Sequence, residues 1–234
     1  MNALTIAILV IVIFICLYYT IEYVFPDVII GKLSPLNPIQ TFGPSTLDNP
    51  NSVRYYYEAW LYIDANTPPD KYNVIFNRGT NFMLTLKGSN LSVFSSDNGA
   101  SGISYSASGQ LTPPQTGFTD ASCVITIMPD FPFQKWTHLV IAVDGANMDV
   151  YIDGKFVKST DKFTNVPGTS GLTVGNAYTQ GKITRFRRIT APINPQGVWA
   201  NYMQGNGQGM SLTPYHLNVQ VLKDNRTQND IRLF

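Results

Sequence analysis

The sequence predicts an all-β sandwich preceded by a single transmembrane α-helix, and three observations support this fold class. Only 13% of the 234 residues are charged, while Gly and Pro number 18 and 15, which suits many short strands joined by turns. A series of short segments rich in β-branched and aromatic residues alternates with turn signals, as in a β-sandwich. Residues 3–21 contain no charged side chain, which indicates a membrane-spanning helix.

The N-terminal segment, residues 1–25, is predicted to be an uncleaved membrane anchor. A helix from Ala3 to Phe25 would be roughly 35 Å long, enough to cross a hydrocarbon core of about 30 Å. A cleaved signal peptide and a buried core helix are the alternatives, but no Lys or Arg precedes the apolar run and no small-x-small cleavage site follows it. The anchor residues are Ala3, Ile6, Leu9, Ile13, Phe14, Leu17, Tyr18 and Tyr19.

The next segment, residues 26–52, contains five prolines among polar residues, which excludes a helix and favours an extended stalk. We expect the β-sandwich to cover residues 53–224 and a polar C-terminal arm to cover residues 225–234. The long segment 97–120 is expected to be a loop, and loops of this length are often functional. A short helical turn is expected within 194–205, and strands are predicted at 53–63, 73–78, 82–88, 91–96, 122–128, 135–144, 148–153, 155–160, 172–175, 182–190 and 215–223.

Two neighbouring segments, WTHLVIAVDG (136–145) and MDVYIDGKFV (148–157), carry the clearest pattern. The first segment is apolar on both faces, because the alternating sets that begin at Trp136 and at Leu139 are both mostly apolar. A strand of this kind belongs in the middle of a sheet. Each segment contains an Asp-Gly pair, and Gly readily takes the positive φ that a tight turn needs, so two successive hairpins are predicted.

The order Trp-x-His, apolar run, Asp-Gly, apolar-Tyr-apolar, Asp-Gly resembles the laminin-G-like (LamG) branch of the concanavalin A-like lectin/glucanase superfamily, over residues 53–205. This resemblance implies a concanavalin A-like jelly-roll β-sandwich. The residues that carry the fold signature are Trp60, Trp136, His138, Asp144, Gly145, Tyr151, Asp153 and Gly154.

The whole chain has a narrower resemblance. Its anchor, proline-rich segment, sandwich and tail NYMQGNGQGMSLTPYHLNVQVLKDN (201–225) are similar to virion proteins of large nucleocytoplasmic DNA viruses, including minor capsid proteins of algal giant viruses. The resemblance implies a single-pass structural protein of the virion, located between the inner membrane and the capsid shell. Its expected partners are the lipid membrane, the major capsid protein and other minor capsid proteins. The net charge of +1 gives no reason to expect nucleic acid.

Enzymatic activity is not expected. The glucanases of the superfamily use paired carboxylates, but this chain has only two Glu residues. Glu22 lies at the membrane boundary, and Glu58 has Tyr56 and Trp60 where an acidic partner would stand. No G-x-S-x-G motif is present, so no catalytic residue is assigned.

No cofactor is assigned either, although calcium stays open because laminin-G-like domains often hold this ion on loop carboxylates and carbonyls. Asp97, Asp120 and Asp130 lie in predicted loops, but isolated Asp residues are commonly turn formers, so no ligands are named. His138 is interpreted as a core or sheet-face histidine bonded to backbone, with a catalytic or metal role as the alternative.

The alternative function is that of a membrane-anchored lectin or attachment protein that binds glycans. Sugar sites use exposed aromatic side chains for stacking. The residues that could contact a glycan or a protein partner are Tyr105, Tyr178, Trp199 and Tyr202.

The segment KITRFRRIT places Lys182, Arg185, Arg187 and Arg188 close together. Alternation puts Arg185 and Arg187 on one strand face and Arg188 on the other. A solvated or salt-bridged sheet face is expected, and a phosphate-binding surface is the alternative. The glycine-rich GNGQG (205–209) does not match the phosphate-loop pattern and is expected to be flexible.

Overall fold

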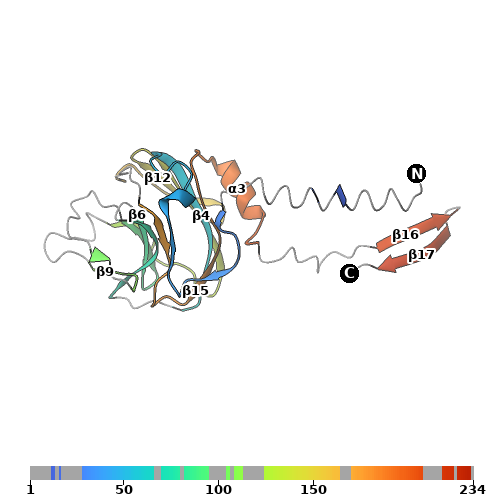
Figure 1. The fold of residues 1–234 in the computed structure, drawn as a ribbon, viewed down its shortest axis with the longest axis horizontal. Coiled ribbons are helices and arrows are strands. Elements are labelled where there is room, and N and C mark those ends of the chain that lie inside the picture. Colours follow the sequence, from blue (N-terminus) through green and yellow to red (C-terminus); the bar gives the residue numbers. More distant parts are fainter. Residues whose placement is uncertain are drawn as a thin grey trace.

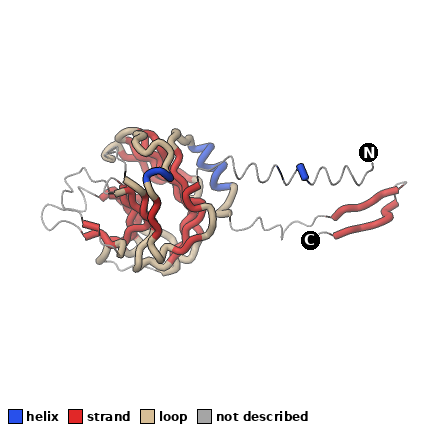
Figure 2. Tube along the Cα trace, in the orientation of Figure 1, coloured by secondary structure: helices blue, strands red, loops and turns tan. Residues whose placement is uncertain are grey.

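The computed structural model describes residues 12–13, 16, 28–65, 70–79, 82–94, 104–105, 108–112, 124–163, 170–207, 218–223 and 226–232. Two antiparallel sheets pack face to face around one main hydrophobic core, as Figures 1 and 2 show. The predicted all-β sandwich is therefore confirmed.

The first sheet, called here the helix-side sheet, has the strand order β1-β15-β4-β11-β12-β13, and β2 also pairs with β15. The helix α3 (Pro195–Met203) lies over its outer face (Figure 1). The strands of this sheet are β1 (Val28–Ile30), β2 (Ser34–Pro35), β4 (Arg54–Ile63), β11 (Trp136–Asp144), β12 (Asn147–Ile152), β13 (Lys155–Thr160) and β15 (Gly181–Ile189).

The second sheet has the order β10-β7-β6-β5-β14-β3, with β9 pairing both β5 and β8. A 3-10 turn, η1 (Pro44–Thr46), follows β3. The strands of the second sheet are β3 (Gln40–Phe42), β5 (Tyr72–Arg78), β6 (Phe82–Lys87), β7 (Asn90–Phe94), β8 (Ser104–Tyr105), β9 (Gln110–Thr112), β10 (Val124–Met128) and β14 (Leu172–Val174).

Strand β4 shows how the sequence pattern builds the core. Its odd-numbered residues from Tyr55 to Ile63 point between the sheets, and the ring of Tyr57 packs against the rings of Phe76, Phe82 and Phe186. The even-numbered residues of β4 point to the outer face under α3. Strand β11 lies between β4 and β12, so the prediction of a central strand is confirmed.

The N-terminal boundary of the sandwich differs from the prediction of a stalk over 26–52. Strands β1 and β2 pair with β15, β3 pairs with β14, and Leu36 is completely buried. The prolines exclude a helix, as expected, but they still permit short edge strands of two or three residues. Residues 28–47 are therefore part of the sandwich.

The C-terminal boundary also differs. The predicted strand 215–223 appears as β16 (Asn218–Lys223), but β16 pairs with β17 (Arg226–Arg232) in a separate two-stranded sheet. This hairpin lies apart from the sandwich in Figure 1. Within segment 97–120, predicted to be a loop, β8 pairs with β9, and residues 97–103, 106–107 and 113–120 lie outside the described part of the chain.

Most of the predicted anchor, residues 1–25, lies outside the described residues, of which it contributes Val12, Ile13 and Cys16. Among the described residues, no helix is long and apolar enough to cross a membrane. The anchor therefore stays a prediction.

The two Asp-Gly turns lie at the tips of successive hairpins. Gly145 has a φ of 63° between β11 and β12, and Asp153 and Gly154 have φ values of 49° and 75° between β12 and β13. In the β12–β13 turn both central residues, Asp153 and Gly154, therefore have positive φ, which is the geometry of a type I′ turn and suits the twist of a hairpin. The β12–β13 turn also lies against α3, because Gly154 faces Trp199 and Tyr202.

Substituting Gly154 with Ala is expected to destabilise the protein more than Gly145→Ala does. A Cβ at residue 154 would lie 2.8 Å from Cε3 of Trp199, whereas a Cβ at residue 145 would meet nothing within 4 Å. The positive φ alone costs Ala about 1 kcal/mol at either position, so we expect losses of about 1 kcal/mol for Gly145→Ala and about 2 kcal/mol for Gly154→Ala. Urea unfolding followed by tryptophan fluorescence measures both, and equal losses would contradict the packing of α3 on this turn.

Candidate functional site

The outer face of the helix-side sheet brings polar residues from three adjacent strands together. Glu58 lies on β4, between β15 and β11. Arg187 on β15 is its cross-strand partner, and His138 on β11 stands opposite Trp60, one step along the same face. Neighbouring side chains on one face of a sheet are within contact distance, so these three groups converge.

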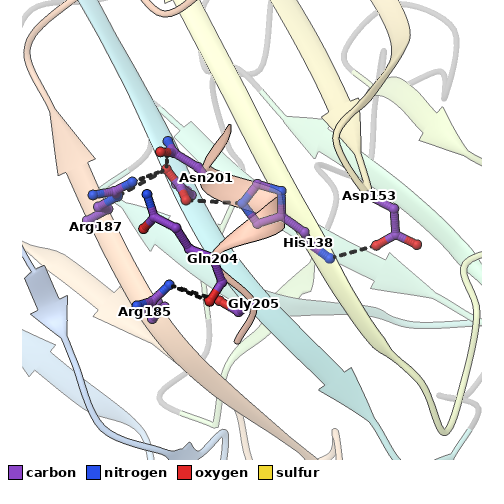
Figure 3. A network of polar contacts seen from close by, with 8 residues as sticks. His138, Asp153, Arg185, Arg187, Asn201, Gln204 and Gly205 are labelled. Carbon is purple, nitrogen blue, oxygen red and sulfur yellow. Dashed lines mark hydrogen bonds and ion pairs between the residues drawn. The ribbon is translucent and has the colours of Figure 1, made fainter. Parts of the chain in front are cut away.

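Three donor side chains hold the carboxylate of Glu58. Figure 3 labels these donors, which are His138, Arg187 and Asn201. Nε2 of His138 lies 3.1 Å from Oε1, and Arg187 donates from Nε and Nη2 to Oε2 at 3.0 and 2.8 Å. Asn201 of α3 donates from Nδ2 to Oε2 at 2.9 Å. An ionised carboxylate only accepts hydrogen bonds, so Nε2 of His138 carries the hydrogen in this contact.

The helix α3 that covers this cluster starts and stops at recognisable caps. The side chain of Asn194 accepts a hydrogen bond from the backbone N–H of Gly197 at 2.7 Å, and Pro195 occupies the first helical position. Val198 packs against Tyr56 and the other apolar residues of the outer face. These contacts hold Asn201 over Glu58.

The C-terminal end of α3 is held by Arg185, whose Nη1 donates to the backbone oxygen of Gly205 at 2.9 Å. A guanidinium at this end satisfies helix carbonyls that lack an intrahelical partner. Gly205 and Gly207 both take positive φ here, and a Cβ on Gly207 would lie 2.9 Å from Nε of Arg185. The first half of the glycine-rich segment, which was expected to be flexible, is thus a helix cap packed on Arg185.

Arg185 itself sits in a β-bulge. Its φ is +50°, and the register with β4 shifts between Thr184 and Arg187. The extra residue lets Ile183 and Phe186 both face the core, although simple alternation would separate them. A cavity of about 90 Å³ opens beside the bulge and is lined by Glu58, Arg185, Arg187 and Gln204.

Burial and hydrogen bonding act in opposite directions on Glu58. Desolvation by burial would raise the pKa of this carboxyl, but the hydrogen bond from His138 and the charge of Arg187 outweigh it and lower the pKa. The lowered pKa means that the folded protein stabilises the ionised form of Glu58.

The lowered pKa of Glu58 predicts a loss of stability in acid. A depressed folded-state pKa contributes stability that is present above the unfolded-state pKa of about 4.3 and is lost as the pH falls through the folded-state value. We therefore expect the free energy of unfolding to fall between pH 5 and pH 3, and to fall less steeply in Glu58→Gln. Urea unfolding at several pH values measures this, and identical slopes for the two proteins would contradict it.

The sequence predicts that His138 bonds to the backbone. In the structure its ring instead contacts the carboxylate of Glu58 on the neighbouring strand. Its backbone N–H donates instead to Oδ1 of Asp153, which also pairs with Lys135 at 2.7 Å. Asp144 pairs with Arg54 at 2.8 Å on the surface, and Tyr151 is buried beside Val198.

The four basic residues of KITRFRRIT have separate roles. Arg187 pairs with Glu58 and Arg185 caps α3, so both lie on the outer side of the sheet. Arg188 is buried on the opposite side, over the ring of Tyr55 at 4.4 Å, and donates to the backbone oxygen of Asp48 at 2.8 Å. Lys182 is exposed near the ring of Tyr62.

The predicted contact aromatics do not form one site. Tyr202 of α3 stacks on Trp60 with ring centroids 5.7 Å apart, and Trp199 lies 5.4 Å from Tyr202. Tyr178 follows β14 and donates to Ser108 at 3.3 Å. Tyr105 lies on β8, and its side chain is outside the described part of the structure.

Within the part of the chain that the structure describes, no group of three or more His, Cys, Asp or Glu side chains could hold a metal ion. Asp130 lies in a described loop, whereas Asp97 and Asp120 lie outside the described residues.

Comparison with known proteins gives a family and a fold. A family model described as "Concanavalin A-like lectin/glucanases superfamily" (Laminin_G_3) matches residues 41–198. No curated protein matches the chain.

Solved structures with a similar fold include the binding domains of botulinum neurotoxins and of Paraclostridial Mosquitocidal Protein 1. The binding domain of botulinum neurotoxin mosaic serotype C/D has a TM-score of 0.50 at 11% identity, over 74% of this chain and 46% of that one. The binding domain of botulinum neurotoxin serotype G has a TM-score of 0.45 at 14% identity, over 68% of this chain and 37% of that one. The binding domain of Paraclostridial Mosquitocidal Protein 1 has a TM-score of 0.46 at 14% identity, over 74% of this chain and 47% of that one. This chain spans less than half of each structure, and the likeness is one of fold alone.

Proposed function

The chain belongs to the concanavalin A-like lectin/glucanases superfamily, and we propose that it is a membrane-anchored interaction protein without catalytic activity. The described part of the site argues against the hydrolytic chemistry found in that superfamily. Glycosidases need two carboxyl groups, about 5 to 10 Å apart, one of which must exchange a proton with the substrate. Glu58 is buried, both of its oxygens accept hydrogen bonds, and no second carboxylate lines its cavity.

One observation carries the binding function. Trp199 and Met203 of α3, four residues apart on the same helix face, are 47% and 65% exposed, and Phe156 of the adjoining hairpin is 57% exposed. We call these three side chains the apolar ridge. Contiguous exposed apolar side chains mark contact surfaces, and Trp and Met are enriched in protein interfaces.

In its finer form, the proposal makes the chain a minor capsid protein that links an internal membrane to a capsid shell. The uncharged run at residues 3–21 supports the membrane attachment, and the resemblance of the tail at residues 201–225 supports the virion assignment. The low content of charged residues suits tight protein packing, because few ions must be desolvated.

A second candidate function is glycan binding, and the adjacent rings of Trp60, Tyr202 and Trp199 favour it. The Lys135–Asp153 ion pair lies at the hairpin that contacts Trp199 and could supply polar contacts. Rings for stacking with a few polar groups beside them are what a sugar site requires.

Two experiments test the proposed function. Detergent extraction of assembled particles followed by crosslinking mass spectrometry is expected to recover the full-length chain in the membrane fraction, crosslinked to capsid proteins. A glycan array probed with the full-length chain is expected to show no defined ligand. Tight binding to one glycan without capsid crosslinks would support the lectin function instead.

A further inference from the structure

The cavity beside the Arg185 bulge, called here the Arg185 cavity, is lined by more positive charge than Glu58 neutralises. Arg185 and Arg187 each bring one positive charge, and ionised Glu58 brings one negative charge. Glu58 is paired with Arg187. Among the described residues Arg185 makes no ion pair, and its hydrogen bonds go to the backbone oxygens of Gln204 and Gly205. One positive charge at the cavity therefore remains uncompensated.

Both guanidinium groups have N–H groups that are not used in these hydrogen bonds. A guanidinium has five N–H groups in a fixed fork. Arg187 uses its Nε and Nη2 on Glu58, and Arg185 uses its Nη1 on the end of α3. The remaining N–H groups belong to two side chains that line the same small space.

The surroundings fix both guanidinium groups before any ligand arrives. The bulge orients Arg185, the end of α3 holds it, and Glu58 holds Arg187. Preorganised donors bind an anion with a smaller loss of side-chain entropy than mobile surface residues do. The cavity volume of about 90 Å³ is enough for several water-sized atoms.

We propose that the Arg185 cavity binds a phosphate group, either as free phosphate or as part of a lipid headgroup. Arg is the preferred partner of phosphate because its planar fork matches two phosphate oxygens. The cavity accepts a single small oxyanion, and the exposed side chain of Gln204 stands at its rim. This inference does not rest on the proposed function, since it needs only the described sandwich and α3.

Phosphate binding is tested by the thermal unfolding of the full-length chain in sodium phosphate and in sodium chloride of equal ionic strength. A ligand that binds only the folded protein raises the unfolding temperature as its concentration increases. We expect a phosphate-specific rise that is lost in Arg185→Gln. It should persist in Arg54→Gln, because Arg54 lies in an exposed ion pair with Asp144.

Arg185→Gln also removes a helix cap, so a second variant separates binding from folding. Gln204→Glu keeps the size of the side chain and leaves the backbone oxygen of Gln204 in place, but it adds a negative charge at the cavity. We expect it to weaken phosphate binding at least tenfold with little change in the unfolding temperature in chloride. An unchanged phosphate affinity in Gln204→Glu, or an equal response in chloride and phosphate for the wild type, would overturn the proposal.

A soluble lipid distinguishes the two sources of the phosphate group, the free ion and a lipid headgroup. Dihexanoyl phosphatidic acid carries the same phosphate on a soluble lipid. Tighter binding of this lipid than of inorganic phosphate, lost in Gln204→Glu, assigns a headgroup site, whereas binding of inorganic phosphate alone assigns a site for the free ion.

Discussion

Replacing Glu58 with Ala is expected to lower the free energy of unfolding by about 3 to 5 kcal/mol, the range found when one partner of a buried ion pair is removed. The substitution leaves Arg187, His138 and Asn201 pointing at a space without an acceptor. It also removes the hydrogen bond from Asn201, which is one of several contacts between α3 and the sheet. Glu58→Gln keeps an acceptor and should lose less.

The matched control is the exposed ion pair of Arg54 and Asp144, whose side chains are 66% and 57% exposed. Ion pairs in water contribute about 0 to 1 kcal/mol, so Asp144→Ala should change the free energy of unfolding by no more than that. Urea unfolding of the full-length chain, followed by tryptophan fluorescence, reports on the sandwich because Trp60, Trp136 and Trp199 all lie on it. Similar small losses at Glu58 and Asp144 would contradict the structural role of the cluster.

The second large effect is expected on binding. The proposed function predicts that Trp199→Ala weakens attachment of the chain to a protein partner about 30-fold, which corresponds to about 2 kcal/mol. Trp199 lies on the apolar ridge beside Met203, and exposed Trp residues dominate the binding energy of many interfaces. Co-sedimentation of the full-length chain with particles that lack it measures the change.

The control for Trp199→Ala is Tyr178→Ala. Both aromatic side chains are 47% exposed, but Tyr178 lies after β14 and not on the apolar ridge. Tyr178→Ala should leave co-sedimentation within about threefold of the wild type, a difference below 1 kcal/mol. Equal losses for the two variants would show that the apolar ridge has no special part in binding.

The β11–β12–β13 hairpins could be predicted from the sequence because their determinants are local. Alternation of apolar residues places Leu139 and Val140 on opposite faces, and the Asp-Gly pairs specify the turns. These signals lie within a few residues of one another, so no knowledge of distant segments is needed.

The Glu58 cluster could not be predicted in the same way. His138, Arg187 and Asn201 are 80, 129 and 143 residues from Glu58 along the chain. Only the order and register of β15, β4 and β11, and the packing of α3 on them, bring these side chains together. On β4 alone, Glu58 has no acidic partner, and its basic partners stand on other strands.

The bulge at Arg185 is a further feature without a local signal, since positive φ is unusual for Arg. A hint was present in the spacing of Ile183 and Phe186, because strict alternation along a strand would put two residues three positions apart on opposite faces. A bulge is the usual way for a strand to bring such a pair to one face. The edge strands of residues 28–42 gave no such hint, because prolines indicate only that a helix is absent.

The central claim is that this sandwich binds a protein through the apolar ridge. A photoreactive amino acid placed at residue 203 of the full-length chain, in assembled particles, tests it most directly, with the same group at residue 178 as the reference. We predict protein crosslinks from residue 203 that are absent from residue 178. No protein crosslink from residue 203, or the same crosslinked species from both positions, would contradict the claim.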